Sequence, residues 1–143
     1  MQNLYNYLKT FGRVRANAPL SKYSAFKIGG PAEFLIEVRE PDKLSQLLNF
    51  VAGEGINYFI LGGGSNVLFP DVGLPGVVVK FNATEVKIEN GIVMAAAGAD
   101  LSAVVQAATA AGLTGLEWAA GIPGSVGGAV RGNAGAHYAF TGG

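Results

Sequence analysis

Apolar residues recur at helical spacing in three parts of the chain. Over residues 42–52 they fall at i, i+3, i+4 and i+7. Asp42 is a candidate N-cap, and the glycines that follow residue 52 end the pattern. Asp100 precedes a second such run, which Gly112 ends. Residues 3–11 carry a shorter version of the same pattern. The spacing therefore predicts three helices.

Period-two alternation and short apolar runs bounded by turn residues predict the strands. The segments that fit are residues 33–38, 58–61, 76–81, 85–88 and 92–97. The last two flank Asn90 and Gly91, a strong two-residue signal for a β-hairpin. The first two flank the helix predicted from Asp42, so we expect a βαβ unit. Residues 19–24 and 115–135 show no period and are expected to be irregular, the second segment rich in loops.

The composition indicates a folded protein with a sizeable core. Half of the 143 residues are apolar and 14% are charged, which argues against disorder. Ten basic residues balance ten acidic ones, so we expect no surface for nucleic acid or an anionic membrane. Gly98 and Asp100 interrupt the apolar residues 91–113, and the first residues lack the pattern of a secretion signal. We expect a soluble, cytoplasmic protein, and a monomer.

Metal and nucleophile chemistry has few candidates in this sequence. The absence of cysteine excludes disulfides, thiolate metal sites and cysteine nucleophiles. His137 is the only histidine, and it has neither a cysteine nor a pair of carboxylates near it in sequence. We therefore expect no metal site, and a surface or structurally satisfied role for His137.

Glycine is the residue whose placement carries most information. The 22 glycines are about twice the usual share of roughly 7%, and one cluster follows a predicted strand at residues 62–64. Glycine permits positive φ, so several backbone N–H groups can turn toward one anion such as a phosphate. A tight turn between strands is the alternative. No Walker A lysine follows, and Val67 stands where a Rossmann fingerprint has its third glycine.

A second glycine-rich segment runs from Glu117 to Ala129 and is built from small residues. A flat, largely apolar ring could lie against such backbone, with Ser125 donating to a phosphate. Close packing of a loop against the core explains the same residues equally well. Nearby, Asn133 is expected to hold a tight turn or donate to a ligand, and Arg131 to be solvated, structurally paired or bound to a phosphate.

Three segments in this order, residues 25–33, 61–68 and 115–136, resemble the UDP-N-acetylenolpyruvoylglucosamine reductase family. The first two alone are similar to the wider superfamily of vanillyl-alcohol-oxidase-type flavin domains, and the third makes the resemblance specific. The resemblance implies an α+β, PCMH-type FAD-binding fold of two small lobes over residues 23–143. Residues 1–22 would form an N-terminal helix and lead-in, and the chain would end before the substrate-binding domain.

The same resemblance implies a noncovalent FAD, with NADPH as hydride donor in the full-length family. The product would be UDP-N-acetylmuramate, formed by reduction of the enolpyruvyl group of a UDP-sugar in peptidoglycan synthesis. Catalytic residues are expected beyond residue 143, so none is assigned here. The cofactor-binding residues implied by the resemblance are Leu61, Gly62, Gly63, Gly64, Ser65, Asn66, Val67, Gly98, Ala99, Gly121, Ile122, Pro123, Gly124, Ser125, Gly127, Gly128, Asn133, Ala134 and Gly135.

Two other functions remain open from the sequence. The chain is also compatible with the FAD-binding part of another flavin-linked oxidase or dehydrogenase of the same superfamily. Alternatively, it is a truncated nucleotide-binding domain that catalyses no reaction, since nothing in its 143 residues matches the catalytic motifs of the family.

Overall fold

The computed structural model describes residues 2–136 and 139–142. The chain divides into two compact units, Met1–Asn82 and Ala83–Gly143, which are described separately. Within the described residues, no helix has the length and apolar character needed to cross a membrane.

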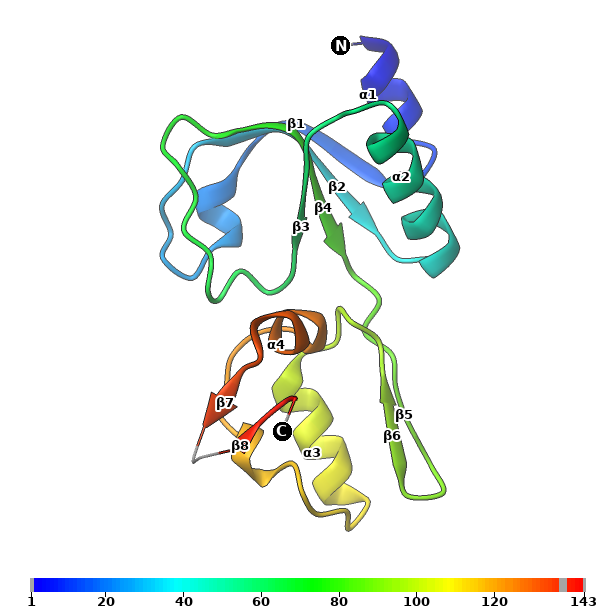
Figure 1. Ribbon diagram of the computed structural model, residues 1–143, viewed down its shortest axis with the longest axis vertical. Helices are drawn as coiled ribbons and strands as arrows, with labels where there is room; N and C mark the ends of the chain where they lie inside the picture. Colours follow the sequence, from blue (N-terminus) through cyan, green and yellow to red (C-terminus); the bar gives the residue numbers. More distant parts are fainter. Residues whose placement is uncertain (1, 137–138, 143) are drawn as a thin grey trace. The chain divides into compact units, whose positions relative to one another are not determined.

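The first unit is built on a four-stranded sheet with the order β1-β2-β4-β3 (Figure 1). Its strands are β1 (Arg13–Pro19), β2 (Pro31–Val38), β3 (Tyr58–Leu61) and β4 (Leu74–Phe81). Strands β2 and β3 both run parallel to β4, whereas β1 is antiparallel to β2. The expected strand–helix–strand order is confirmed, but β2 and β3 are not neighbours because β4 lies between them. Strand β1 was not predicted from the sequence.

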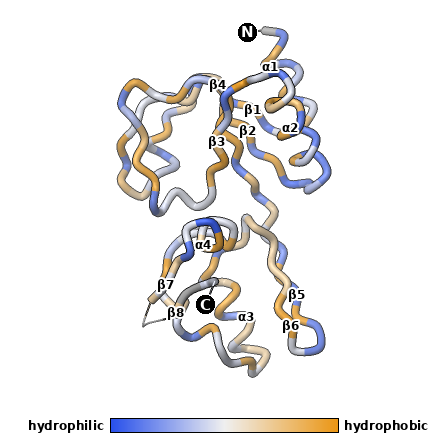
Figure 2. The backbone as a smooth tube through the Cα atoms, viewed as in Figure 1, coloured by the Kyte–Doolittle hydropathy of each residue, from blue (hydrophilic) through white to orange (hydrophobic). Residues whose placement is uncertain are grey.

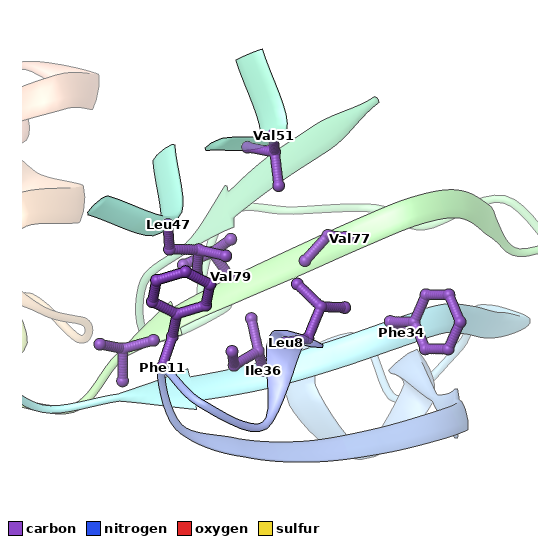
Figure 3. Close-up of a cluster of buried hydrophobic side chains, with 9 residues drawn as sticks. Leu8, Phe11, Phe34, Ile36, Leu47, Val51, Val77 and Val79 are labelled. Carbon is purple, nitrogen blue, oxygen red and sulfur yellow. The ribbon is translucent and has the colours of Figure 1, made fainter. Parts of the chain in front are cut away.

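Two helices, α1 (Gln2–Leu8) and α2 (Pro41–Gly53), cover one face of this sheet. Figure 3 shows Leu8, Leu47 and Val51 pointing toward Ile36, Val77 and Val79 of the strands. These side chains are almost completely buried, and each such aliphatic side chain stabilises the fold by roughly 1.5–3 kcal/mol.

The start of α2 differs from the prediction. Its N-cap is Glu40 rather than Asp42, which lies in the first turn. Pro41 explains the difference, because its fixed φ and missing N–H suit the first helical position. Proline also keeps the preceding residue extended, as the ψ of 125° at Glu40 shows.

The other face of the sheet is covered by irregular chain. The 3-10 turn η1 (Leu20–Tyr23) and the segment after β3, residues 62–73, lie there (Figure 1). Leu20 and Phe69 pack with Leu35, Leu61 and Val78, all buried. The cluster holds the segment that follows β3 against the sheet, and the candidate site lies in that segment.

The second unit begins with a hairpin of β5 (Val86–Glu89) and β6 (Ile92–Ala95), as predicted. Asn90 (φ 52°) and Gly91 (φ 76°) form its turn, and both have the positive φ that a type I′ turn requires. Figure 2 shows that the tip of this hairpin is hydrophilic. Helix α3 (Leu101–Ala110) follows with Asp100 as its N-cap, confirming that prediction.

Residues 115–135 are more regular than expected. They contain the 3-10 turn η2 (Glu117–Ala119) and a short helix, α4 (Val126–Gly132). Two short strands, β7 (Gly135–Ala136) and β8 (Ala139–Phe140), follow and pair with each other. The expectation of a loop was therefore wrong for α4. The glycines of that helix conceal it in the sequence, because glycine has low helix propensity.

Candidate functional site

The glycine-rich segment of the first unit, residues 62–68, is called here the glycine loop. It leaves β3 after Leu61, whose Cα partner on β4 is Lys80. Because β2, β4 and β3 are parallel, their carboxyl ends meet at one edge of the sheet, and the glycine loop begins at that edge. Ligands of open α/β sheets bind at the carboxyl ends of the strands.

Three carbonyl groups of the glycine loop accept hydrogen bonds from elsewhere in the first unit. The bonds, donor to acceptor, are Lys80 Nζ to Gly62 O (3.0 Å), Ala25 N to Gly64 O (3.0 Å) and Ser24 Oγ to Val67 O (2.9 Å). These bonds turn the acceptor side of the loop backbone toward the protein.

The amide side of the glycine loop is not used in this way. Within the part of the chain that the structure describes, no N–H of residues 63–66 or of Leu68 donates to a protein acceptor. In a planar trans peptide the C=O of one residue and the N–H of the next point in opposite directions. The tethered carbonyls of Gly62, Gly64 and Val67 therefore direct the amides of Gly63, Ser65 and Leu68 outward, where they are available to an anion.

Gly64 is required by the packing of this loop. Its φ is 72°, and a Cβ at this position would lie 1.8 Å from the carbonyl oxygen of Tyr23. No side chain fits at that distance. The close approach of the two backbones brings Ala25 N within hydrogen-bonding distance of Gly64 O.

A polar network stands beside the glycine loop at the ends of β2 and β4. Glu37 is the Cα partner of Lys80, accepts from Asn82 Nδ2 (3.2 Å) and forms an ion pair with Arg15 (3.5 Å). Burial lowers the pKa of the Lys80 ammonium, and the negative charge of Glu37 acts in the opposite direction.

Ser24 and Lys80 were not among the predicted site residues. Ser24 is 7% exposed, and its hydroxyl also accepts from Phe26 N (3.2 Å). The sequence holds one signal for Lys80, a single charge after the valines of an apolar strand. It holds none for Ser24, because the contact to Val67 spans 43 residues.

In the second unit, the structure brings together two predicted parts of the site. The turn at Gly98 and Ala99 lies against residues 124–127 through hydrogen bonds between main-chain atoms. These are Leu101 N to Gly124 O (2.9 Å), Val126 N to Ala99 O (2.9 Å) and Gly127 N to Ala97 O (2.8 Å). The glycine at position 127 fits closely, because a Cβ there would lie 3.0 Å from Ala97.

These hydrogen bonds reduce the number of backbone N–H groups in residues 121–128 that are free to bind a ligand. Val126 and Gly127 donate within the protein, and Gly128 N donates to Ser125 Oγ (3.3 Å), so the buried Ser125 is the N-cap of α4. Among the described residues, the amides of Gly124 and Ser125 have no protein acceptor. The roles predicted for Gly121, Ile122 and Pro123 stay predictions.

Asn133 has a structural role in the second unit. It ends α4 in the left-handed conformation (φ 45°), and its side-chain oxygen accepts from Gly142 N (3.0 Å). The turn expected there is confirmed. Ala134 N donates to Ala129 O (2.9 Å), and a cofactor contact of Ala134 or Gly135 stays a prediction. His137 lies outside the described residues.

Comparison with known proteins identifies the family of this chain. A family model described as "FAD binding domain" matches residues 32–143. The chain is 46% identical over 125 residues to a UDP-N-acetylenolpyruvoylglucosamine reductase of Clostridium novyi (strain NT), covering 87% of this chain and 41% of that protein. It is 40% identical over 139 residues to the enzyme of that name from Synechococcus sp. (strain CC9311), covering 95% and 45%.

A solved structure shows the same fold. The crystal structure of UDP-N-acetylenolpyruvylglucosamine reductase from Thermus caldophilus is similar with a TM-score of 0.74 and 35% identity. The similarity covers 91% of this chain and 46% of that one. The expected α+β class is confirmed, and the chain spans less than half the length of the relatives it matches.

Proposed function

The chain belongs to the FAD binding domain family, and from that premise we propose that it binds a dissociable FAD, with the glycine loop of the first unit on the diphosphate. The observation that carries this proposal is the glycine loop, with three carbonyls tethered inward and the amides of residues 63–66 left free. Free amides beside a half-buried lysine suit the negative charge of a diphosphate.

The second unit, taken by itself, also offers free main-chain donors. We propose that the amides of Gly124 and Ser125 donate to a cofactor, with the small residues at 121–123 lying against its ring. The bound flavin would supply hydride transfer. The protein's part is to bind and orient the flavin and to keep water from it.

We further propose that the chain is the FAD-binding portion of a reductase of the kind named in its relatives. That enzyme would take hydride from NADPH and reduce the enolpyruvyl group of a UDP-sugar in the cytoplasm. Relatives of this name at 46% and 40% identity favour the reductase over other flavin-linked oxidases of the superfamily. The substrate-binding and proton-donating groups would lie in sequence that the 143 residues do not include.

The direct test is the optical spectrum of the purified chain after incubation with FAD and gel filtration. We expect flavin absorbance to co-elute with the protein, and acid to release unmodified FAD. Elution without flavin at any FAD concentration tested would contradict the proposed binding. NADPH oxidation that depends on the enolpyruvyl sugar is expected only from a protein that includes the missing part, so turnover by these 143 residues would contradict the proposed division of roles.

A further inference from the structure

The contact of Lys80 with Gly62 crosses from one strand to the chain that leaves its neighbour. Lys80 lies on β4, between β2 and β3, and its Nζ is 3.0 Å from the carbonyl oxygen of Gly62. The sheet ladder fixes the backbone of Lys80, because Glu37 on β2 and Leu61 on β3 are its Cα partners. The lysine is therefore a tether from a central strand to the first residue of the glycine loop.

This tether determines the direction of one particular amide. The C=O of Gly62 and the N–H of Gly63 belong to the same planar peptide, so a bond to the carbonyl fixes where the N–H points. The neighbouring residues are glycines, which have the widest choice of φ and ψ. Without the tether, that peptide is free to rotate and direct its carbonyl oxygen toward a bound phosphate, where it would repel the anion.

Ser24 fixes the far end of the glycine loop in the same way. Its hydroxyl donates to the carbonyl of Val67, which orients the N–H of Leu68. The middle of the loop is held by main-chain atoms alone, from Ala25 N to Gly64 O. The loop therefore has two side-chain tethers, one near each end.

The partial burial of the Lys80 ammonium costs free energy, and the hydrogen bond to Gly62 O compensates for part of it. Burial of an ammonium group is unfavourable unless hydrogen bonds and opposite charge compensate for it. Glu37 on the adjacent strand supplies the opposite charge, and that carboxylate is itself held by Asn82 and Arg15. An apolar side chain on this strand would fill the same space without that cost, and it would leave Gly62 O without a donor.

We propose that Lys80 and Ser24 are positioning residues for the cofactor's diphosphate, acting through the peptides that they tether rather than by contact with the ligand. The inference rests on the proposed FAD binding. It assigns the specificity of the glycine loop for an anion to two side chains outside the loop. In the wild-type chain both tethers are formed before the ligand arrives, so the loop amides are preorganised.

The test compares FAD affinity with the stability of the cofactor-free chain in four variants. Lys80→Met and Ser24→Ala each remove one tether, Lys80→Arg keeps a charged donor, and Lys43→Met is a control on α2, where the partly exposed lysine pairs with Glu40. We expect Lys80→Met and Ser24→Ala to weaken FAD binding by roughly tenfold or more, the scale of a lost hydrogen bond to a charged or buried group. Lys80→Arg should recover most of the affinity, and Lys43→Met should match the wild type.

The outcomes distinguish failure of the proposed FAD binding from failure of the roles assigned to Lys80 and Ser24. A wild-type chain that takes up no FAD contradicts the proposed function, and the inference fails with it. A wild-type chain that binds FAD while Lys80→Met and Ser24→Ala bind it equally well contradicts the inference alone. The inference is also wrong if the variants lose FAD affinity only in proportion to a lower melting temperature of their cofactor-free forms, and Lys80→Arg restores neither the affinity nor the melting temperature. Loss of affinity at an unchanged melting temperature supports it.

Discussion

Replacement of Gly64 by alanine tests the packing on which the glycine loop depends. The added Cβ would lie 1.8 Å from the carbonyl oxygen of Tyr23, and real Cβ contacts essentially never fall below 3.0 Å. The two backbones must therefore separate, which breaks the 3.0 Å hydrogen bond from Ala25 N to Gly64 O. The φ of 72° adds the strain of a left-handed alanine.

The expected magnitude follows from these two terms. A left-handed conformation costs a non-glycine residue about 1–2 kcal/mol, and a lost backbone hydrogen bond costs about 0.5–1.5 kcal/mol more. Gly55→Ala is the matched control, because Gly55 has a φ of 64° and nothing within 4 Å of its Cβ position. It carries the same strain and the same change in the unfolded chain, so the difference between the variants isolates the contact with Tyr23.

The assays are urea denaturation followed by far-UV circular dichroism and titration with FAD. We expect Gly64→Ala to be less stable than Gly55→Ala by at least roughly 0.5–1.5 kcal/mol, and to bind FAD at least about tenfold more weakly than that control. Equal stability and equal FAD affinity of the two variants would show that the contact with Tyr23 does not determine the shape of the glycine loop.

Two further predictions concern the second unit. Asp100→Ala should lower the free energy of unfolding by about 1 kcal/mol through loss of the N-cap of α3, measured by urea denaturation at neutral pH. The hydrogen bond from the Ser102 hydroxyl is the main cause of the lowered pKa of Asp100. The wild type should therefore lose the stability contributed by Asp100 as the pH falls below about 3.9. An Asp100→Ala variant whose stability falls in acid just as the wild type's does would contradict this. Gly127→Ala should be less stable than Gly132→Ala, because the Cβ added at position 127 would lie 3.0 Å from Ala97, whereas position 132 has open space and the same gain in helix propensity. The reverse order in thermal melts would refute the packing described.

The elements that the sequence predicts well are those whose local pattern and tertiary role agree. Strand β3 matches its prediction of residues 58–61, because its apolar run is bounded by turn residues. The β5–β6 hairpin follows from Asn90 and Gly91, and α3 from the cap at Asp100. In each case a residue with a specific backbone preference marks the boundary.

Strand β1 and helix α4 escape prediction for different physical reasons. Strand β1 is an edge strand whose residues are mostly exposed, so no apolar alternation marks it, and its pairing with β2 defines it. Helix α4 has seven residues, among them Gly127, Gly128 and Gly132. The Ser125 cap and the burial of Ala129 against Leu101 and Ala119 hold it in place.

The candidate site divides in the same way. The glycine loop is predictable because glycine, Ser65 and Asn66 directly after a strand indicate a turn of free amides. The tethers from Ser24 and Lys80 are not predictable, since they join residues 43 and 18 positions apart through the sheet and η1. Periodicity reports which face of an element is buried, and it carries no information on contacts at that separation.

The most direct test of the glycine loop as the diphosphate site is the amide NMR spectrum of the nitrogen-labelled chain, with and without FAD. The amides of residues 63–66 donate to no acceptor in the described part of the protein, so we expect them to exchange rapidly with solvent in the free chain. Added FAD should shift these resonances and slow their exchange. FAD that binds while leaving these amides unshifted and rapidly exchanging would contradict the account.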